Sequence, residues 1–251
     1  MATLFISDLH LDGSRPEVTQ QFLDFLRAEA RKADALYILG DLFELWIGDD
    51  DTDPEKRRIV AALADLTRSG VPCSILRGNR DFLLGERFSR DSGCKLLEEG
   101  TVVDLYGQPA QLMHGDTLCT DDRSYQRLRR ILHNRIVQWA IRHLSLPRRN
   151  ALAAKIREGS KAHTTRTAPM IMDVNAEAVV SAFADRRIST LIHGHTHRPA
   201  IHSLEVAGRS VQRIVLGDWY TQGSVLEWSR DKHELKSLPR SQGSTLHSLD
   251  G

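Results

Sequence analysis

Five short apolar runs each lead into a cluster of Asp, Asn or His, and this pattern constrains the fold more than any other feature. The runs and their clusters are TLFIS before Asp8-Leu9-His10, ALYIL before Gly40-Asp41, SIL before Gly78-Asn79-Arg80-Asp81, AQLM before His114-Gly115-Asp116, and STLI before His193 to His197. Ligands of open α/β sheets bind beyond the carboxyl ends of the strands. We therefore expect the five clusters to converge on one crevice.

The order of the predicted elements indicates an α/β fold. Apolar strand-like runs alternate with helical patterns up to about residue 96, which is typical of parallel βαβ units, and later runs indicate antiparallel strands. Residues 124–165 are helical in pattern, with a break where Pro147 forbids a continuous helix. We predict a core formed by 1–123 and 166–238, a helical cap insertion at 124–165, and a disordered Ser- and Gly-rich tail at 239–251.

The run LIHGHTHRPA places histidines at positions 193, 195 and 197. Side chains at every second position point to one side of an extended chain, so two of these imidazoles can reach one ion or two neighbouring ions. The strand-end clusters offer oxygen and nitrogen donors without thiolate, a set that suits Mn²⁺, Fe²⁺ or Zn²⁺. Cys73, Cys94 and Cys119 show no metal-ligand spacing, and we expect them to be small buried hydrophobes.

Charge is unevenly distributed along the chain. Residues 121–170 hold twelve Lys or Arg and three Asp or Glu, so this window is +9 within a chain of net charge +1. An anionic partner is expected there. Met1-Ala2-Thr3 leads straight into a strand-like run and no apolar stretch approaches about 20 residues, so we expect no signal peptide, no membrane span and a cytoplasmic location.

The set DLH, GDLFE, GNRD, MHGD and GHTH, which spans most of the chain, resembles the calcineurin-like metallophosphoesterase superfamily. This resemblance implies a four-layer αββα sandwich. Within the superfamily, FISDLHL, YILGDLFELWIGDD, RGNRDFLLG, MHGDTLCTDD, IHGHTHRPA and RIVLGDWY resemble the pyrophosphatases of lipid A biosynthesis. The implied reaction is hydrolysis of the diphosphate of UDP-2,3-diacylglucosamine to 2,3-diacylglucosamine 1-phosphate and UMP, with two Mn²⁺ ions that activate water.

The resemblance also implies roles for individual residues. One ion is expected on Asp8, His10, Asp41 and His197, and the other on Asp41, Asn79, His114 and His195. Asp41 is then the bridge and His193 a structural bystander. The residues expected to act directly in catalysis are Asp41, Arg80 and His195, with Arg80 donating to the diphosphate.

Substrate contacts implied by the resemblance fall on Asn79, Arg80, Asp122, Ser160, Thr164 and His195. A further position that is often basic in relatives corresponds here to Arg166 or to Thr167, and the sequence leaves both open. A solvated turn acid is the alternative for Asp122, and ordinary helix-end polar residues are the alternative for Ser160 and Thr164. Trp46 is interpreted as core or site-wall packing in preference to a base-stacking platform.

The predicted cap carries more apolar residues than a surface helix needs. Its apolar stripe is formed by Leu128, Leu132, Ile136, Trp139, Ala140 and Leu144, widened by Ile131, Val137 and Ile141. Packing on the main domain would explain this excess of apolar residues. The alternative explanation is a cap that receives an acyl chain and rests on the anionic cytoplasmic face of the inner membrane. We expect neither a nucleic-acid partner nor an obligate protein partner. The alternatives are a soluble phosphoesterase acting on another nucleotide diphosphate or a phosphodiester, and a non-catalytic scaffold.

Overall fold

The computed structural model describes residues 1–166, 173–184, 187–220 and 223–238, with the backbone alone described for 160–166. The side chains of Ser160, Thr164 and Arg166, the residue Thr167 and the predicted tail at 239–251 lie outside the described part. Their predicted roles therefore stay predictions.

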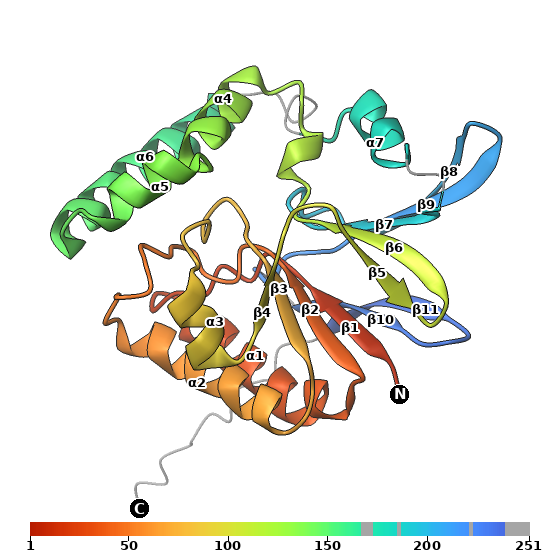
Figure 1. The fold of residues 1–251 in the computed structure, drawn as a ribbon, viewed down its shortest axis with the longest axis horizontal. Coiled ribbons are helices and arrows are strands. Elements are labelled where there is room, and N and C mark those ends of the chain that lie inside the picture. Colours follow the sequence, from red (N-terminus) through yellow and green to blue (C-terminus); the bar gives the residue numbers. More distant parts are fainter. Residues whose placement is uncertain (167–172, 185–186, 221–222, 239–251) are drawn as a thin grey trace, which may run out of the picture.

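The first sheet contains six strands, and its central part is parallel (Figure 1). Its order is β11 (His233–Leu238), β10 (Gly223–Trp228), β1 (Thr3–Ile6), β2 (Ala35–Leu39), β3 (Cys73–Leu76) and β4 (Lys95–Leu97). Strands β1 to β4 run parallel, whereas β10 pairs antiparallel with both β1 and β11. The predicted βαβ units thus form one continuous set of strands whose carboxyl ends lie at the same edge.

The second sheet has five strands and packs face to face on the first. Its order is β5 (Thr101–Leu105), β6 (Gln108–Met113), β7 (Thr190–His193), β9 (Arg209–Val215) and β8 (Ala200–Val206). The two inner faces share one apolar cluster, in which Phe5 and Leu226 of the first sheet meet Leu112, Ile192 and Ile214 of the second. Burial of these side chains fixes how the edge formed by β1 to β3 sits against the ends of β6 and β7.

Helices cover the outer faces of both sheets. The first sheet is covered by α1 (Pro16–Ala28), α2 (Pro54–Arg68) and α3 (Glu86–Ser92), and the second by α7 (Ala176–Ala182). Helix α2 begins at Pro54, which occupies its first turn, and the Asp53 carboxylate accepts from the N–H groups of Glu55 and Lys56. Two short 3₁₀ turns, Ala30–Lys32 and Asp116–Leu118, complete the elements. The expected four-layer αββα sandwich is confirmed.

Three helices project from the sandwich as a helical arm, which we define as α4 (Arg123–Leu132), α5 (Arg135–Arg142) and α6 (Leu146–Arg166) (Figure 1). The predicted break at Pro147 is confirmed. A second break lies between α4 and α5, where the Asn134 side chain accepts from the N–H groups of Ile136 and Val137. The prediction of one apolar stripe along a single helix was therefore wrong.

The apolar residues of the arm divide between two environments. Ile141 is buried in the core cluster, and Leu132, Val137 and Leu152 pack against that cluster. Ile131, Ile136 and Trp139 instead remain 56%, 76% and 62% exposed. Within the described residues, no helix is long and apolar enough to cross a bilayer.

Candidate metal centre

The strand ends converge as the sequence predicts. Asp8, His10 and His197 bring ligand atoms within 4.8 Å of one another, and so do Asp8, Asp41 and His114. These residues follow β1, β2, β6 and β7, although β6 and β7 belong to the second sheet. The crevice therefore lies where the edges of the two sheets meet.

Four buried ligand atoms have no hydrogen-bond partner among the described residues. They are Asp8 Oδ1, His10 Nε2, Asn79 Oδ1 and His114 Nε2. A buried polar atom without a partner costs about 1–3 kcal/mol in mutational data. Because all four can be lone-pair donors in the same crevice, the residues fit a site for divalent cations.

The predicted ligands sit on unusual backbone. Asp8, His10, Asp41, His195 and His197 have φ between 49° and 68°, a region that side chains other than glycine rarely adopt. The only other such residues among those described are Tyr106 and Ala207, each of which precedes a glycine in a β-hairpin turn. Five of the seven predicted ligands therefore share a strained conformation, which is typical of functional sites.

This backbone also corrects the interpretation of the histidine run. β7 ends at His193, and the chain turns through left-handed backbone at His195 and His197, so the three histidines do not alternate along an extended strand. His193 is fully buried, and its Nδ1 pairs with the Gly194 carbonyl at 2.9 Å. His195 lies beside His114, with ring centroids 5.1 Å apart, and its Nδ1 is 3.4 Å from Asn79 Nδ2.

Three imidazoles are oriented by oxygen atoms on their Nδ1 side. His10 Nδ1 lies 3.1 Å from Glu44 Oε2, and His197 Nδ1 lies 3.2 Å from Asp218 Oδ2. His114 Nδ1 pairs with the Leu39 carbonyl at 2.9 Å. Support of this kind fixes the ring and directs Nε2 toward an ion, as is usual for metal-ligating histidines.

Asp41 lies between the two groups of ligands. Its Oδ2 is 3.8 Å from both His10 Nε2 and His114 Nε2, while its Oδ1 accepts from the backbone N–H of Arg80 at 2.8 Å. The loop after β3 can approach this carboxylate only because residue 78 is glycine, since a Cβ there would lie 2.2 Å from Asp41 Oδ1. The position is the one that a bridging ligand needs.

The carboxylates perturb the neighbouring imidazoles strongly. Burial alone would lower the pKa of His114, but the charges of Asp41, Asp116, Asp8 and Glu99 raise it to about 9. Asp218 and Asp8 likewise outweigh burial and raise the pKa of His197 to about 10. Ligating imidazoles must be neutral, so cation binding here displaces protons.

A buried carboxylate links the centre to the helical arm. Asp116 is 1% exposed, and its Oδ2 accepts from Tyr125 Oη at 2.9 Å and from Arg129 Nε at 2.6 Å. The Tyr125 ring lies 5.8 Å from the His195 ring. Sequence analysis did not assign Asp116, Tyr125 or Arg129, although Asp116 belongs to the MHGD cluster.

The predicted substrate contacts are only partly described. Asn79 and Arg80 line a narrow, mainly apolar pocket between the core and the arm. Asp122 is buried at the start of α4, where its carboxylate accepts from the N–H of Tyr125 and the hydroxyl of Ser124. In the described structure Asp122 therefore caps a helix.

The narrow pocket has an apolar wall and a charged end. Its wall is formed by Trp46, Phe82, Leu83, Ile141, Leu152 and Ile156. At the charged end Arg157 Nε lies 3.1 Å from Glu44 Oε1. Trp46 packs on Phe43 and Phe88 and is 4% exposed, which agrees with its interpretation as wall packing.

A two-sheet sandwich with Asp, His and Asn side chains gathered at its strand ends defines a metal-dependent phosphoesterase. The chain belongs to this class: the family model for calcineurin-like phosphoesterases matches residues 1–199. A protein of Yersinia enterocolitica named UDP-2,3-diacylglucosamine hydrolase is 52% identical over 95% of this chain and all of its own. Proteins of the same name from Pseudomonas paraeruginosa and Photobacterium profundum are 51% and 50% identical, over 95% and 94% of this chain and 100% and 97% of their own.

Proposed function

We propose that the chain hydrolyses the diphosphate bond of UDP-2,3-diacylglucosamine, giving 2,3-diacylglucosamine 1-phosphate and UMP in lipid A biosynthesis. The observation that carries the proposal is the set of buried ligand atoms without a hydrogen-bond partner on Asp8, His10, Asn79 and His114, next to an apolar pocket. The relatives that match over their full length carry the name of this activity.

Two divalent cations are assigned to the centre, with Mn²⁺ as the proposed metal. Asp8, His10, Asp41 and His197 would hold one ion, and Asp41, Asn79, His114 and His195 the other. When bound, such a pair neutralises charge on the diphosphate and activates water for in-line attack. The site is rich in oxygen and imidazole nitrogen donors and lacks thiolate, which supports a first-row metal of this kind.

The residues of the chain supply position and charge. The Asp41 carboxylate is held by the Arg80 N–H and so keeps a fixed place between the two groups of ligands. We assign to the Arg80 guanidinium the task of donating to the diphosphate oxygens, since Arg80 lines the pocket beside Asn79. His195 and Asn79, 3.4 Å apart, are assigned to the face where the leaving phosphate would lie. A phosphate leaving group needs no strong general acid, so these contacts suffice.

The helical arm is proposed as the cap that selects an acylated substrate. The narrow pocket between Trp46, Phe82 and Leu83 of the core and Ile141 and Leu152 of the arm is apolar enough for an acyl chain. Burying a hydrocarbon chain there contributes about 0.8 kcal/mol for each methylene group. A soluble nucleotide diphosphate would gain nothing from such a wall, which weighs against the soluble alternative.

The arm is also proposed to rest on the cytoplasmic face of the inner membrane. Ile131, Ile136 and Trp139 are exposed on α4 and α5, within the window of charge +9. Apolar side chains surrounded by basic residues favour an anionic lipid surface, from which a lipid-linked substrate could be taken.

The proposal is tested by incubating metal-stripped protein with UDP-2,3-diacylglucosamine in ¹⁸O-labelled water, with and without Mn²⁺, and identifying the products by mass spectrometry. We expect Mn²⁺-dependent release with the label in UMP. Label in the sugar phosphate would reverse the assigned direction of attack. Turnover of a generic phosphodiester without release of UMP would instead favour the soluble alternative, and no turnover of any phosphoester would favour a scaffold.

Arg80→Ala separates metal binding from substrate binding in the same assay. Because only the backbone of Arg80 contacts a predicted ligand, the variant should keep its metal content and lose turnover. Loss of metal in this variant would contradict the role assigned to the guanidinium.

A further inference from the structure

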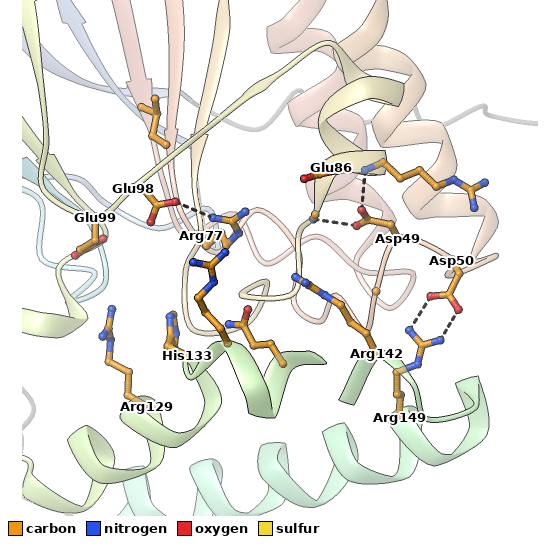
Figure 2. Close-up of a pocket in the computed structure, with 16 residues that line it drawn as sticks. Asp49, Asp50, Arg77, Glu86, Glu98, Glu99, Arg129, His133, Arg142 and Arg149 are labelled. Carbon is orange, nitrogen blue, oxygen red and sulfur yellow. Dashed lines mark hydrogen bonds and ion pairs between the residues drawn. The ribbon is translucent and has the colours of Figure 1, made fainter. Parts of the chain in front are cut away.

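A second cavity, larger than the apolar pocket, also lies between the helical arm and the core, and Arg149 lines both cavities. This groove has a volume of about 830 Å³ and runs between α4 and α5 on one side and the segments around residues 48–50, 85–87 and 97–99 on the other (Figure 2). None of the predicted metal ligands lines it. We call it the arginine groove, because six of the residues that line it are arginine: Arg77, Arg87, Arg129, Arg135, Arg142 and Arg149.

Most carboxylates of the arginine groove are already engaged. Asp49 accepts from three backbone N–H groups and from Trp46 Nε1, and Asp50 pairs with Arg149 (Figure 2). Glu99 accepts from the His114 N–H and the Thr117 hydroxyl. These acids are therefore poor partners for further cations.

Cationic groups remain that the acids do not neutralise. In the part of the chain that the structure describes, no acidic side chain lies within ion-pair distance of Arg135 or Arg142. The Arg142 side chain points into the groove and faces Arg77 across it (Figure 2). Arg77 lies 3.8 Å from Glu98, whose side chain is 93% exposed, so solvent screens this pair.

A half-buried histidine, His133, contributes no positive charge to the groove. Burial and the charge of Arg129 lower the pKa of His133 to about 4. His133 lines the groove next to Arg129 and is therefore neutral at physiological pH. The groove is lined by acids as well as arginines, and Arg135 and Arg142 are the two lining arginines for which the described part of the chain provides no ion-pair partner.

The lining indicates which anion fits. Among the described residues that line the groove there is no Phe, Tyr or Trp, and Leu97 is the only aliphatic side chain. A nucleotide base would find no Phe, Tyr or Trp ring to stack on there. Guanidinium groups bind phosphate oxygens with paired donors, so a phosphate group is the chemistry that the groove matches.

The position of the groove on α5 indicates the source of that phosphate. Arg135, Gln138 and Arg142 recur at helical spacing and line the groove, while Ile136 and Trp139 are exposed on the neighbouring face of the same helix. We propose that the arginine groove is a second, non-catalytic site that binds the phosphate of an anionic phospholipid headgroup through Arg77, Arg135 and Arg142. The lipid source rests on the proposed membrane contact of the arm.

Vesicle sedimentation with matched charge variants tests this site. The groove variant is Arg135→Gln/Arg142→Gln, and the control is Arg127→Gln/Arg130→Gln, which removes the same charge from exposed positions of α4 outside the groove. At about 1 kcal/mol for each phosphate contact, the groove variant should bind phosphatidylglycerol vesicles roughly tenfold or more weakly than wild type. The control should stay within about threefold. Equal losses in both variants would reduce the effect to general electrostatic attraction and overturn the proposal.

Soluble probes separate a lipid headgroup from free phosphate. Titration of the wild type with glycerophosphoglycerol and with inorganic phosphate should show binding of the headgroup analogue that the groove variant loses. Preference for inorganic phosphate, with vesicle binding unchanged in the groove variant, would make free phosphate the ligand and overturn the lipid source.

Two further measurements keep the proposals apart. Ile136→Ser/Trp139→Ser should lose binding to phosphatidylcholine and phosphatidylglycerol vesicles alike yet still bind the headgroup analogue, because it alters the apolar face and leaves the groove intact. Release of UMP from detergent-dispersed substrate should be unchanged in Arg135→Gln/Arg142→Gln. Absence of UMP release in the wild type would refute the proposed function alone, since vesicle binding needs no turnover.

Discussion

Asp116→Asn is the substitution that most directly tests how the helical arm is held on the metal centre. The change keeps the shape of the side chain and removes the negative charge that pairs with Arg129 at 2.6 Å. Asn can still accept from the Tyr125 hydroxyl, but Arg129 would lose its only carboxylate within ion-pair distance among the described residues. The substitution therefore isolates the charge of one buried group.

The magnitude follows from burial. The Asp116 side chain is 1% exposed and the Arg129 side chain 18%, so the pair is only weakly screened by solvent. A hydrogen bond between charged groups contributes about 1.5–3 kcal/mol, and removing one partner of a buried pair costs about 3–5 kcal/mol. Because Arg129 can reach some solvent, we expect a loss of about 2–4 kcal/mol, a fall in Tm on the order of 10 °C for a chain of this size.

The pH dependence gives an independent check. Although burial alone would raise it, the charges of His114 and Arg129 hold the pKa of Asp116 well below its usual value. A carboxylate of depressed pKa stabilises the fold above its unfolded pKa of about 3.9, and that contribution is lost as the pH falls through the folded pKa. The difference between wild type and Asp116→Asn should therefore be constant at neutral pH and shrink in acid.

The assay is urea denaturation together with steady-state turnover, and Asp65→Asn is the matched control. Asp65 pairs with Arg68 on the surface of α2, and both side chains are mostly exposed, so the control should change stability by less than about 1 kcal/mol. Asp116→Asn should raise KM more than it lowers kcat, because the arm forms one wall of the proposed substrate pocket while the Leu39 carbonyl still orients His114. Unchanged stability, or an equal loss in both variants, would refute the coupling.

Three further outcomes are expected. Asp41→Ala should lower turnover at least ~1,000-fold and remove both proposed ions, measured by elemental analysis of the purified variant, because Asp41 is the proposed bridge between the two groups of ligands. Gly78→Ala should also lose metal, since its Cβ would lie 2.2 Å from Asp41 Oδ1, whereas Gly13→Ala, with no atom within 4 Å, should keep it. With pKa values of about 9 for His114 and about 10 for His197, Mn²⁺ binding near neutral pH should release close to two protons. Titration calorimetry in buffers of different ionisation enthalpy measures this number, and the affinity for Mn²⁺ should rise about 100-fold per pH unit. Release of less than one proton would contradict the raised pKa values. In the metal-free protein, protonated His114 and His197 stabilise the fold fully below about pH 6.5, and this stabilisation is lost as the pH rises through 9 to 10.

The order of strands and clusters could be predicted because it is local in the sequence. An apolar run that stops at Asp8, Asp41 or His114 marks the carboxyl end of a strand. It therefore also predicts the edge of the sheet at which the polar residue lies. The N-terminal helix signals at Pro54 and Pro147 are local in the same way. The break before α5 was missed although Asn134 is a common residue at a helix start.

The supports of the metal centre could not be predicted in this way. Asp218 meets His197 from 21 positions away, and Arg157 meets Glu44 from beyond α5, so their partners depend on how the sheets and the arm pack. No local pattern identifies the left-handed backbone at His195 either, since it is imposed by contacts such as the N–H of His195 to Asp8 Oδ2 at 2.8 Å. Tertiary contacts therefore determine which of several possible histidines can face an ion.

The left-handed backbone conformation of five predicted ligands reverses the usual order of alanine and glycine substitutions. Alanine usually harms a protein less than glycine does, because glycine gains more freedom in the unfolded chain. At Asp8 or His197, where φ is 54°, alanine would remove the ligand and keep a conformation that costs an L-residue about 1 kcal/mol or more, while glycine would remove the ligand and relieve that cost. At these positions predicted ligands occupy a backbone conformation that favours glycine. Comparing the two substitutions at one position separates the contribution of the side chain to ion binding from the cost of the backbone conformation to folding.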